Sequence, residues 1–285
     1  MSGFSETTAV TALGDGRYAC NFSAAWSTLA GINGGILMAT LVRAIEAEVG
    51  EGRGLRSLQC QFMRPPKAGD AEITIEVMRS GARATNLRLR IEQGGKTMLE
   101  GLAACFTPGL RELATWSRNA PAVEVPGDDP PVFTDPRRPS TADHVIYTPR
   151  IGPPPFSGTL PGPGEPARTG GWLELRDPQP VDVALLAFFS DAWWPAALGP
   201  LDIVAFNPTI DITFDVRTTL PPGGLPHQPL LLEALTRASL EGLCDEDAWV
   251  YAADGTLLAH SRQLAITMTP DDRPMVTHED HSALE

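Results

Sequence analysis

The sequence predicts an α+β fold made of two similar units, each with one helix followed by an antiparallel sheet. Helical spacing of apolar residues, followed by several strand-like segments, occurs twice along the chain. A short strand motif also recurs, as SLQCQF from Ser57 and as TIDITF from Thr209, each followed by a Pro-Pro pair. These repeats are most simply explained by an internal duplication of about 150 residues.

The first unit is expected to span residues 1–106 and to contain one long helix at residues 33–50, NGGILMATLVRAIEAEVG. Asn33 is a suitable N-cap, and Gly50 is a suitable C-terminal stop. Apolar residues recur along this segment at helical spacing, at Leu37, Leu41, Ala44 and Ile45. This spacing predicts a helix with one buried face.

Strand-like segments follow this helix and are separated by turn signals at Pro65-Pro66, Ser80-Gly81 and Gly94-Gly95. The predicted strands are residues 55–63, 71–79, 84–92 and 97–106. Together with the helix, they predict an antiparallel sheet that follows a single helix.

The second unit is expected at residues 142–269, after a Pro-rich linker at 107–141, with a polar tail at 270–285. A second Pro-rich stretch at 153–171 predicts a loop before this unit's helix. The helix is predicted at residues 181–198 and the strands at residues 203–217, 230–238, 248–252 and 257–268. The order of elements in the first unit is therefore repeated.

Composition narrows the class of protein. The net charge of −13 disfavours nucleic acid as a partner, because a phosphate backbone is repelled by an acidic surface. No stretch approaches the roughly 20 apolar residues of a membrane span, and no export signal begins the chain. The four widely spaced cysteines predict buried, reduced thiols. We expect a soluble, cytoplasmic protein without a metal site or a separate cofactor.

Three polar residues are candidates for chemistry. Asp191 shares the apolar face of the second predicted helix, where loss of water raises a carboxylate's pKa and makes it a better general base. Thr209 begins the strand TIDITFDVR, where alternation places it on the same face as three other polar residues: Asp211, Thr213 and Asp215. Gln263 lies among small residues of the last strand. Taken singly, each of the three has an ordinary structural explanation.

Gly34 and Gly35 follow the predicted N-cap and expose backbone N–H groups at a helix start. The partial positive charge there suits a carbonyl oxygen that develops negative charge, so both glycines are candidate substrate-binding residues. Glycines are common at helix starts, and this signal is weak by itself. No GxSxG motif is present, and a serine-hydrolase elbow is not predicted.

The pattern resembles the acyl-CoA thioesterase II family, whose members are double hot-dog proteins. The segments that carry the resemblance are NGGILMATLVRA, FMRPPKAGDAEITIEVMRSGARATNLRLRIEQGGKTMLEGLAACF, FFSDAWWP, PTIDITF and LLAHSRQLAITM. It implies that each helix is wrapped by its antiparallel sheet. It also implies catalytic roles for Asp191, Thr209 and Gln263, which match the family's Asp, Thr and Gln that orient the attacking water.

The implied reaction is hydrolysis of an acyl-CoA thioester to free fatty acid and coenzyme A, with no covalent acyl-enzyme. Coenzyme A belongs to the substrate, and no cofactor is implied. The resemblance also predicts a homo-oligomer of double hot-dog chains. Two alternatives remain open: a non-catalytic acyl-CoA binding module, and a hot-dog dehydratase or hydratase, which would need His144 or His260 to approach the site through folding.

Overall fold

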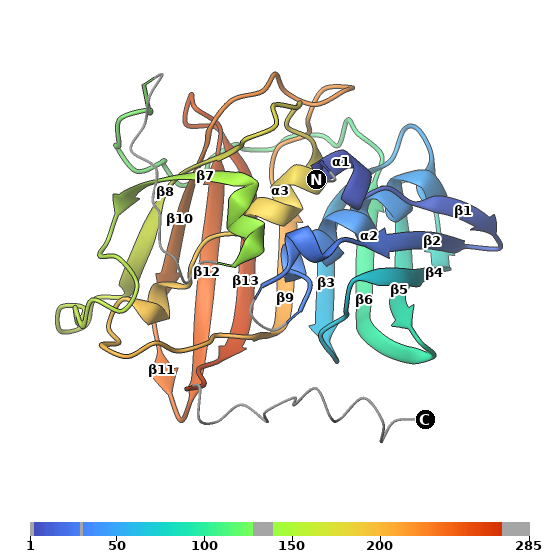
Figure 1. Ribbon diagram of the computed structural model, residues 1–285. Coiled ribbons are helices and arrows are strands. Elements are labelled where there is room, and N and C mark those ends of the chain that lie inside the picture. The colour runs from blue at the N-terminus through green and yellow to red at the C-terminus, as the bar shows by residue number, and fades with distance from the viewer. Residues whose placement is uncertain (1–2, 29–30, 128–138, 270–285) are drawn as a thin grey trace, which may run out of the picture.

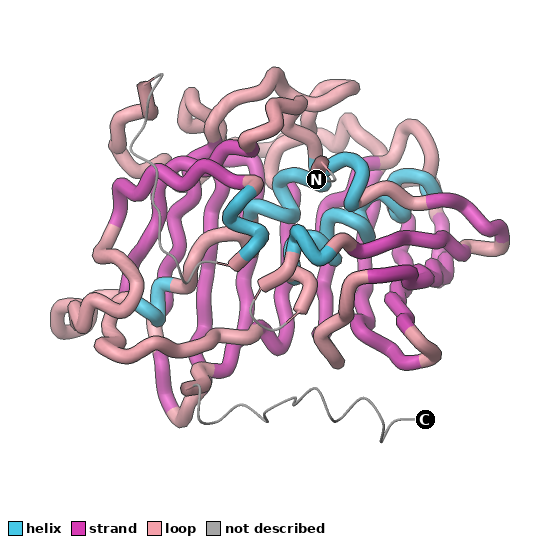
Figure 2. The backbone as a smooth tube through the Cα atoms, in the orientation of Figure 1, coloured by secondary structure: helices cyan, strands magenta, loops and turns pink. Residues whose placement is uncertain are grey.

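The computed structural model describes residues 3–28, 31–127 and 139–269 of the 285-residue chain. Its strands form one continuous antiparallel sheet that curves around two central helices (Figure 1). Helices cluster on one side of this sheet, as Figure 2 shows. In the described part of the chain, no helix is long and apolar enough to cross a membrane. The predicted polar tail at 270–285 lies outside the described residues.

The first half confirms the predicted helix and strands. Helix α2 (Gly34–Val49) is capped by Asn33, whose side chain accepts from the N–H of Ile36, and it stops at Gly50. The predicted strands are found with ends shifted by two residues or fewer: β3 (Gly54–Phe62), β4 (Gly69–Ser80), β5 (Ala84–Gln93) and β6 (Lys96–Phe106). Four further elements precede α2: helix α1 (Phe4–Thr7), β1 (Thr11–Gly14), β2 (Arg17–Phe22) and a 3₁₀ turn at Ala24–Trp26.

The second half contains helix α3 (Val183–Phe189) and two 3₁₀ turns, at Ser140–Asp143 and Ala196–Leu198. Its strands are β7 (Val145–Ile151), β8 (Ala167–Leu175), β9 (Thr209–Val216), β10 (Leu230–Thr236), β11 (Ser239–Leu240), β12 (Leu243–Tyr251) and β13 (Leu257–Ile266). Strands β7 and β8 come before α3 and were not predicted, whereas the predicted order of a helix and then strands repeats from α3 onward.

Three boundaries in the second half were predicted wrongly. The predicted helix 181–198 ends at Phe189, the strand predicted from residue 203 begins at Thr209, and the strand predicted at 248–252 begins at Leu243. The helix was overestimated because its sequence is apolar on nearly every face, so periodicity does not mark its end. Pro195 also prevents a helix from continuing through it.

The loop predicted at 153–171 is shorter than expected, because β8 begins at Ala167 and contains Gly170 and Gly171. These glycines mark close backbone contact rather than a turn. A Cβ at Gly170 would lie 2.2 Å from the carbonyl oxygen of Leu232, and one at Gly171 would lie 2.3 Å from that of Thr148. Both glycines have positive φ as well.

The strand order is β1-β2-β4-β5-β6-β3-β9-β13-β12-β10-β8-β7, and β11 pairs with β12. The two halves join where β3 pairs with β9, with Cys60 opposite Ile212. These two residues are also equivalent in the repeated motif SLQCQF and TIDITF. Antiparallel pairing of equivalent residues is what a local two-fold axis between two units requires. The register therefore supports the internal duplication.

Helices α2 and α3 pack against each other on the concave side of the sheet. Both helices contribute fully buried apolar side chains to one core, such as Leu37 and Leu41 of α2 and Phe188 of α3. Arg43 of α2 pairs with Asp182, the N-cap of α3, and Gly35 at the start of α2 lies against the residues that follow α3. The helices are thus antiparallel, and the N-terminus of α2 meets the C-terminal end of α3.

The described part of the predicted linker, residues 107–127, forms no helix or strand, but it packs on the outer face of the second half. Ala120 and Val123 contact a small apolar cluster that includes Trp172 and Tyr251. The indole N–H of Trp172 donates to the carbonyl oxygen of Glu124 at 2.7 Å. The outer face of the sheet is therefore covered locally, while the inner face holds the helices.

Candidate active site

Asp191 lies just after α3, in a turn rather than within the helix. Its backbone N–H donates to the carbonyl oxygen of Phe188 at 3.1 Å, which completes the last turn. The carbonyl groups that follow the helix are satisfied by side chains from elsewhere. Asn33 donates to the carbonyl oxygen of Asp191 at 3.4 Å, and the Tyr147 hydroxyl donates to that of Ala192 at 2.9 Å. These contacts fix the position of Asp191 outside the helix.

The carboxylate of Asp191 accepts a hydrogen bond from the backbone N–H of Gly35, with a distance of 2.9 Å between the nitrogen and Oδ2. A side chain is not tolerated at this approach. A Cβ at Gly34 would lie 2.7 Å from Oδ2 of Asp191 and 3.1 Å from the ring of Phe62, and one at Gly35 would lie 2.5 Å from the carbonyl oxygen of Phe188. The two glycines allow the start of α2 to reach the carboxylate.

Burial raises the pKa of Asp191 to about 7, and the hydrogen bond from Gly35 offsets only part of that rise. The residue nevertheless keeps some contact with solvent. A carboxyl group with a pKa near neutrality is suited to accept a proton from water, because its basicity matches the pH at which it works.

Thr209 faces the inner side of the sheet, contrary to the prediction that it shares a face with Asp211. The register between β9 and β13 shifts by one residue, with Leu264 opposite Asp211 and Ala265 opposite Thr209. The extra residue, Ile210, forms a β-bulge that reverses the alternation at the start of β9. The predicted alternation therefore holds only for the rest of the strand.

The bulge brings Thr209 to Gln263, since the hydroxyl of Thr209 donates to Oε1 of Gln263 at 2.7 Å. The amide nitrogen of Gln263 in turn donates to Oε1 of Glu246 at 2.9 Å. The other oxygen of Glu246 accepts from the backbone N–H of Ala196 at 2.7 Å. This chain of hydrogen bonds links β9, β13 and β12 to the segment that follows α3.

Glu246 was missed by the sequence analysis, because its strand was predicted to begin at residue 248. A strand from Leu243 places Glu246 on the same face as three buried residues: Cys244, Ala248 and Val250. That alternation is the signal that would have identified it. Burial raises the pKa of Glu246 to about 7, the bonds from Ala196 and Gln263 lower it, and the charge of Asp191 raises it.

The structure thus brings Thr209 and Gln263 into direct contact and places Asp191 close enough to act electrostatically on Glu246 and on Cys60. Among the described residues, no hydrogen bond joins Asp191 directly to Thr209 or Gln263. The four cysteines are buried and unpaired by disulfides, as predicted.

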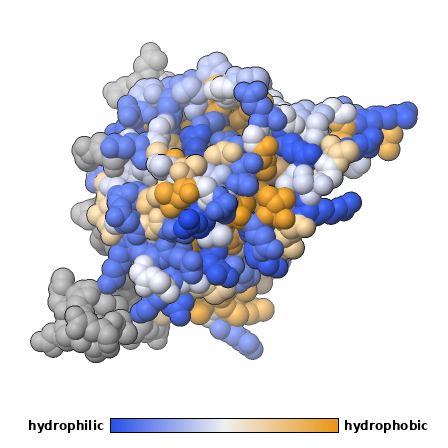
Figure 3. Space-filling view, turned by 90° about the vertical axis from the view of Figure 1, so that its right-hand side faces the viewer, coloured by the Kyte–Doolittle hydropathy of each residue, from blue (hydrophilic) through white to orange (hydrophobic). Residues whose placement is uncertain are grey.

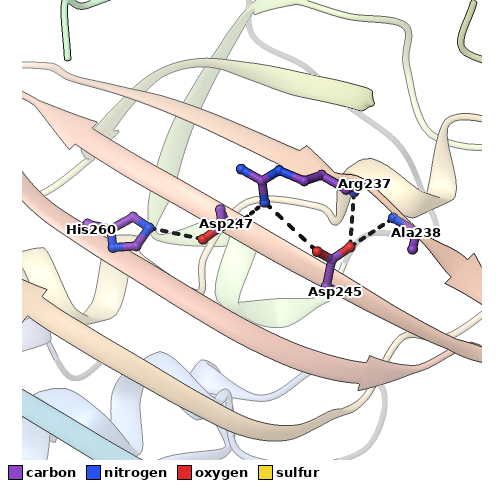
Figure 4. A network of polar contacts seen from close by, with 5 residues as sticks. All are labelled: Arg237, Ala238, Asp245, Asp247 and His260. Carbon is purple, nitrogen blue, oxygen red and sulfur yellow. Dashed lines mark hydrogen bonds and ion pairs between the residues drawn. The ribbon is translucent and has the colours of Figure 1, made fainter. Parts of the chain in front are cut away.

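The histidines needed by a dehydratase lie elsewhere. His260 lies on the outer face of β13, where it bonds to Asp247 at 3.1 Å, and Asp247 also pairs with Arg237 (Figure 4). His144 stacks on Trp26 with ring centroids 4.0 Å apart, and burial lowers its pKa. Within the described residues, neither histidine is bonded to Asp191.

Comparisons with solved structures show the same fold. The chain is 23% identical to a conserved hot-dog protein of unknown function from Alicyclobacillus acidocaldarius, with a TM-score of 0.81 over 94% of this chain and 98% of that one. It is 26% identical to a candidate thioesterase II from Thermobifida fusca, with a TM-score of 0.77 and the same coverage. An acyl-CoA thioesterase II from Mycobacterium marinum is 17% identical, with a TM-score of 0.72 over 95% of this chain and 98% of that one.

These likenesses confirm the double hot-dog fold, and the class of protein is that of hot-dog thioester hydrolases. Residues 22–106 match the acyl-CoA thioesterase N-terminal domain, and residues 117–267 match the acyl-CoA thioesterase C-terminal domain. The chain belongs to the acyl-CoA thioesterase family. A search of curated proteins by sequence gives no significant match.

Proposed function

We propose that Asp191, Thr209 and Gln263 hold one water molecule and direct it at the thioester carbonyl of an acyl-CoA. The products are a free fatty acid and coenzyme A, and no covalent acyl-enzyme forms. The observation that carries the proposal is that the carboxylate of Asp191, with a pKa near 7, lies on the concave side of the sheet, where Thr209 and Gln263 form a hydrogen-bonded pair. In this mechanism Asp191 removes the proton from the attacking water.

The direction of the hydrogen bonds supports this assignment. Thr209 uses its only hydroxyl hydrogen in the bond to Gln263, so its oxygen is suited to accept a hydrogen bond from the water. Gln263 uses one N–H on Glu246 and has a second that is suited to donate to the water oxygen. A fixed hydrogen-bond acceptor and a fixed donor together orient a water molecule better than either alone.

The oxyanion that develops on the substrate also needs a donor. The N–H of Gly35 is bonded to Asp191, so in this arrangement it orients the base rather than the substrate. The N–H of Gly34, one residue earlier at the same positive end of α2, is the donor that the proposal assigns to the oxyanion.

The test is release of free coenzyme A from a panel of acyl-CoAs, from acetyl to palmitoyl, by wild type and by Asp191→Asn. The expected result is turnover by wild type and a loss of about a thousandfold in the variant. Asp211→Asn, on the outer face of β9, is the matched control and should retain wild-type turnover. Binding of acyl-CoA without turnover by wild type would favour the non-catalytic binding module and contradict the proposal.

The proposal includes a homo-oligomer. The sheet ends in open edges at β1 and β7. The end that carries β1 exposes apolar side chains, among them Leu13 of β1 and Val77 and Met78 of β4 (Figure 3). Exposed apolar residues beside an open sheet edge suit contact with a second copy. Sedimentation velocity of the purified chain should give a mass above that of the monomer, and a monomer at all concentrations would contradict it.

A further inference from the structure

Glu246 is a carboxylate buried on the inner face of the sheet with a donor on each of its oxygens. Only 6% of its surface is exposed. Oε2 accepts from the N–H of Ala196, and Oε1 accepts from the side-chain amide of Gln263. Removing a charged group from water costs free energy unless such partners compensate for it. A buried carboxylate therefore needs an explanation that packing alone does not give.

The two-fold relation between the units shows that the fold does not need a carboxylate at this position. One row of residues crosses the sheet in register, in the order Glu246, Gln263, Ile212, Cys60, Gly101, Leu89. The axis lies between Ile212 and Cys60, so Gly101 is the counterpart of Gln263 and Leu89 is the counterpart of Glu246. Leu89 is fully buried. The first unit builds the same sheet with glycine and leucine where the second has two polar side chains.

A carboxylate is the side chain of this shape that accepts hydrogen bonds on both oxygens. Because Oε1 of Glu246 accepts, the amide of Gln263 must point its nitrogen toward Glu246 and its oxygen toward Thr209. An amide at position 246 would always present a donor to one of its two neighbours. Either the N–H of Ala196 would then lose its acceptor, or the amide of Gln263 would have to turn over.

We infer that Glu246 is a positioning residue, which fixes the orientation of the Gln263 amide and, through it, the direction of the hydrogen bond from Thr209. This inference rests on the proposed function, in which Thr209 and Gln263 orient the attacking water. Glu246 itself does not touch the water or the substrate. It acts by allowing only one of the two amide orientations, and that orientation leaves the oxygen of Thr209 free to accept.

Glu246 also carries a charge that acts on the catalytic base. The charged groups that raise its own pKa are Asp191, from the segment after α3, and Asp245, on its own strand. Because the charge of Asp191 raises the pKa of Glu246, the two carboxylates titrate as a coupled pair. Removing the charge at position 246 should therefore shift the ionisation of Asp191 to lower pH. A purely structural role for Glu246 would not produce that shift.

The experiment compares Glu246→Gln with Asp247→Asn, the next residue along β12. Asp247 is as buried as Glu246, since 6% of its surface is exposed as well. It faces the outer side of the sheet, where its partners are Arg237 and His260 (Figure 4). For each variant, kcat, KM and the pH dependence of kcat/KM are measured on the acyl-CoA that wild type hydrolyses fastest.

Glu246→Gln is expected to lower kcat by about tenfold to a hundredfold, because the water loses its fixed orientation, with little change in KM. Its pH profile should move to lower pH, while Asp247→Asn keeps the wild-type kcat and profile. Equal behaviour of the two variants would overturn the inference, and so would a loss of kcat without a shift of the profile. An inactive wild type, or a fully active Asp191→Asn, would instead overturn the proposed function on which the inference rests.

A second variant covers the case in which Glu246→Gln does not fold. Glu246→Leu copies the residue that the first unit has at the equivalent position, Leu89, and an apolar side chain removes the need to satisfy a buried charge. It leaves the N–H of Ala196 and the amide of Gln263 without their acceptor, so it should remain folded with a lower stability than wild type. It should lose the same activity and show the same shift of the pH profile. Wild-type kcat in a folded Glu246→Leu would overturn the inference.

Discussion

The backbone N–H of Gly35 donates a hydrogen bond to Oδ2 of Asp191 at 2.9 Å, although the two residues are 156 positions apart in the sequence. Gly35 lies in the first turn of α2, where N–H groups lack partners within the helix and carry partial positive charge. The helix of the first unit therefore orients the carboxylate of the second. The site exists only where the two units meet, and it needs the duplicated chain to be intact.

The stability of the fold should depend on pH through Asp191. Burial raises the pKa of Asp191 from 3.8 to about 7, so between these values the folded chain holds a proton that the unfolded chain has lost. The free energy of unfolding contributed by this group therefore falls as pH rises toward 7. Asp191→Asn removes that loss and should raise Tm by at least about 2 °C at about pH 8, with a smaller gain at about pH 5.

Thermal unfolding of both proteins, followed by circular dichroism at the two pH values, measures this effect. Glu246 remains in both proteins, but the charge of Asp191 raises its pKa, so Asp191→Asn also lowers the pKa of Glu246 and adds to the gain in stability at the higher pH. A gain in Tm that is the same at both pH values, or a variant less stable than wild type at the higher pH, would show that ionised Asp191 does not cost stability.

Gly34→Ala should displace the carboxylate of Asp191. The added Cβ would lie 2.7 Å from Oδ2 of Asp191, closer than real contacts permit, so the carboxylate must move away from its position. We expect kcat to fall by about tenfold to a hundredfold. Gly54→Ala is the matched control, because a Cβ there meets no atom within 4 Å. Wild-type kcat in Gly34→Ala would show that the approach of α2 to Asp191 does not matter for turnover.

Thr209→Val keeps the shape of the side chain and removes its hydroxyl. The substitution removes the Thr209–Gln263 hydrogen bond and the oxygen that accepts a hydrogen bond from the water in the proposed mechanism. We therefore expect kcat to fall by about a hundredfold. Thr213→Val changes the same residue type on the outer face of the same strand and should leave kcat within about twofold of wild type. Steady-state rates of the two variants test the assignment directly, and equal rates would argue against a role for Thr209.

Local signals were enough to predict much of the first half. Asn33 and Gly50 bound α2 as predicted, since capping depends on a few neighbouring residues. The repeated motif indicated the duplication, and the opposition of Cys60 and Ile212 agrees with it. These features depend on residues close together in sequence or on an internal comparison.

Features of the site that depend on tertiary contacts were not predictable in the same way. The end of α3 before Asp191 is stabilised by Asn33 and Tyr147, which are distant in sequence. The bulge at Ile210 appears only in the register between β9 and β13. Because of this bulge, Thr209 lies on the inner face beside Gln263, whereas simple alternation along the strand would place it on the outer face.

The most direct test of the central claim, that Asp191 is the general base, is the pH dependence of kcat/KM for wild type and for Asp191→Asn. Because Asp191 accepts a proton only when ionised and its pKa lies near 7, the wild-type rate should rise with pH and level off above about pH 8. The residual rate of the variant should lack this rise. A wild-type rate that does not change across neutral pH, or a variant that keeps the same rising profile, would contradict the account.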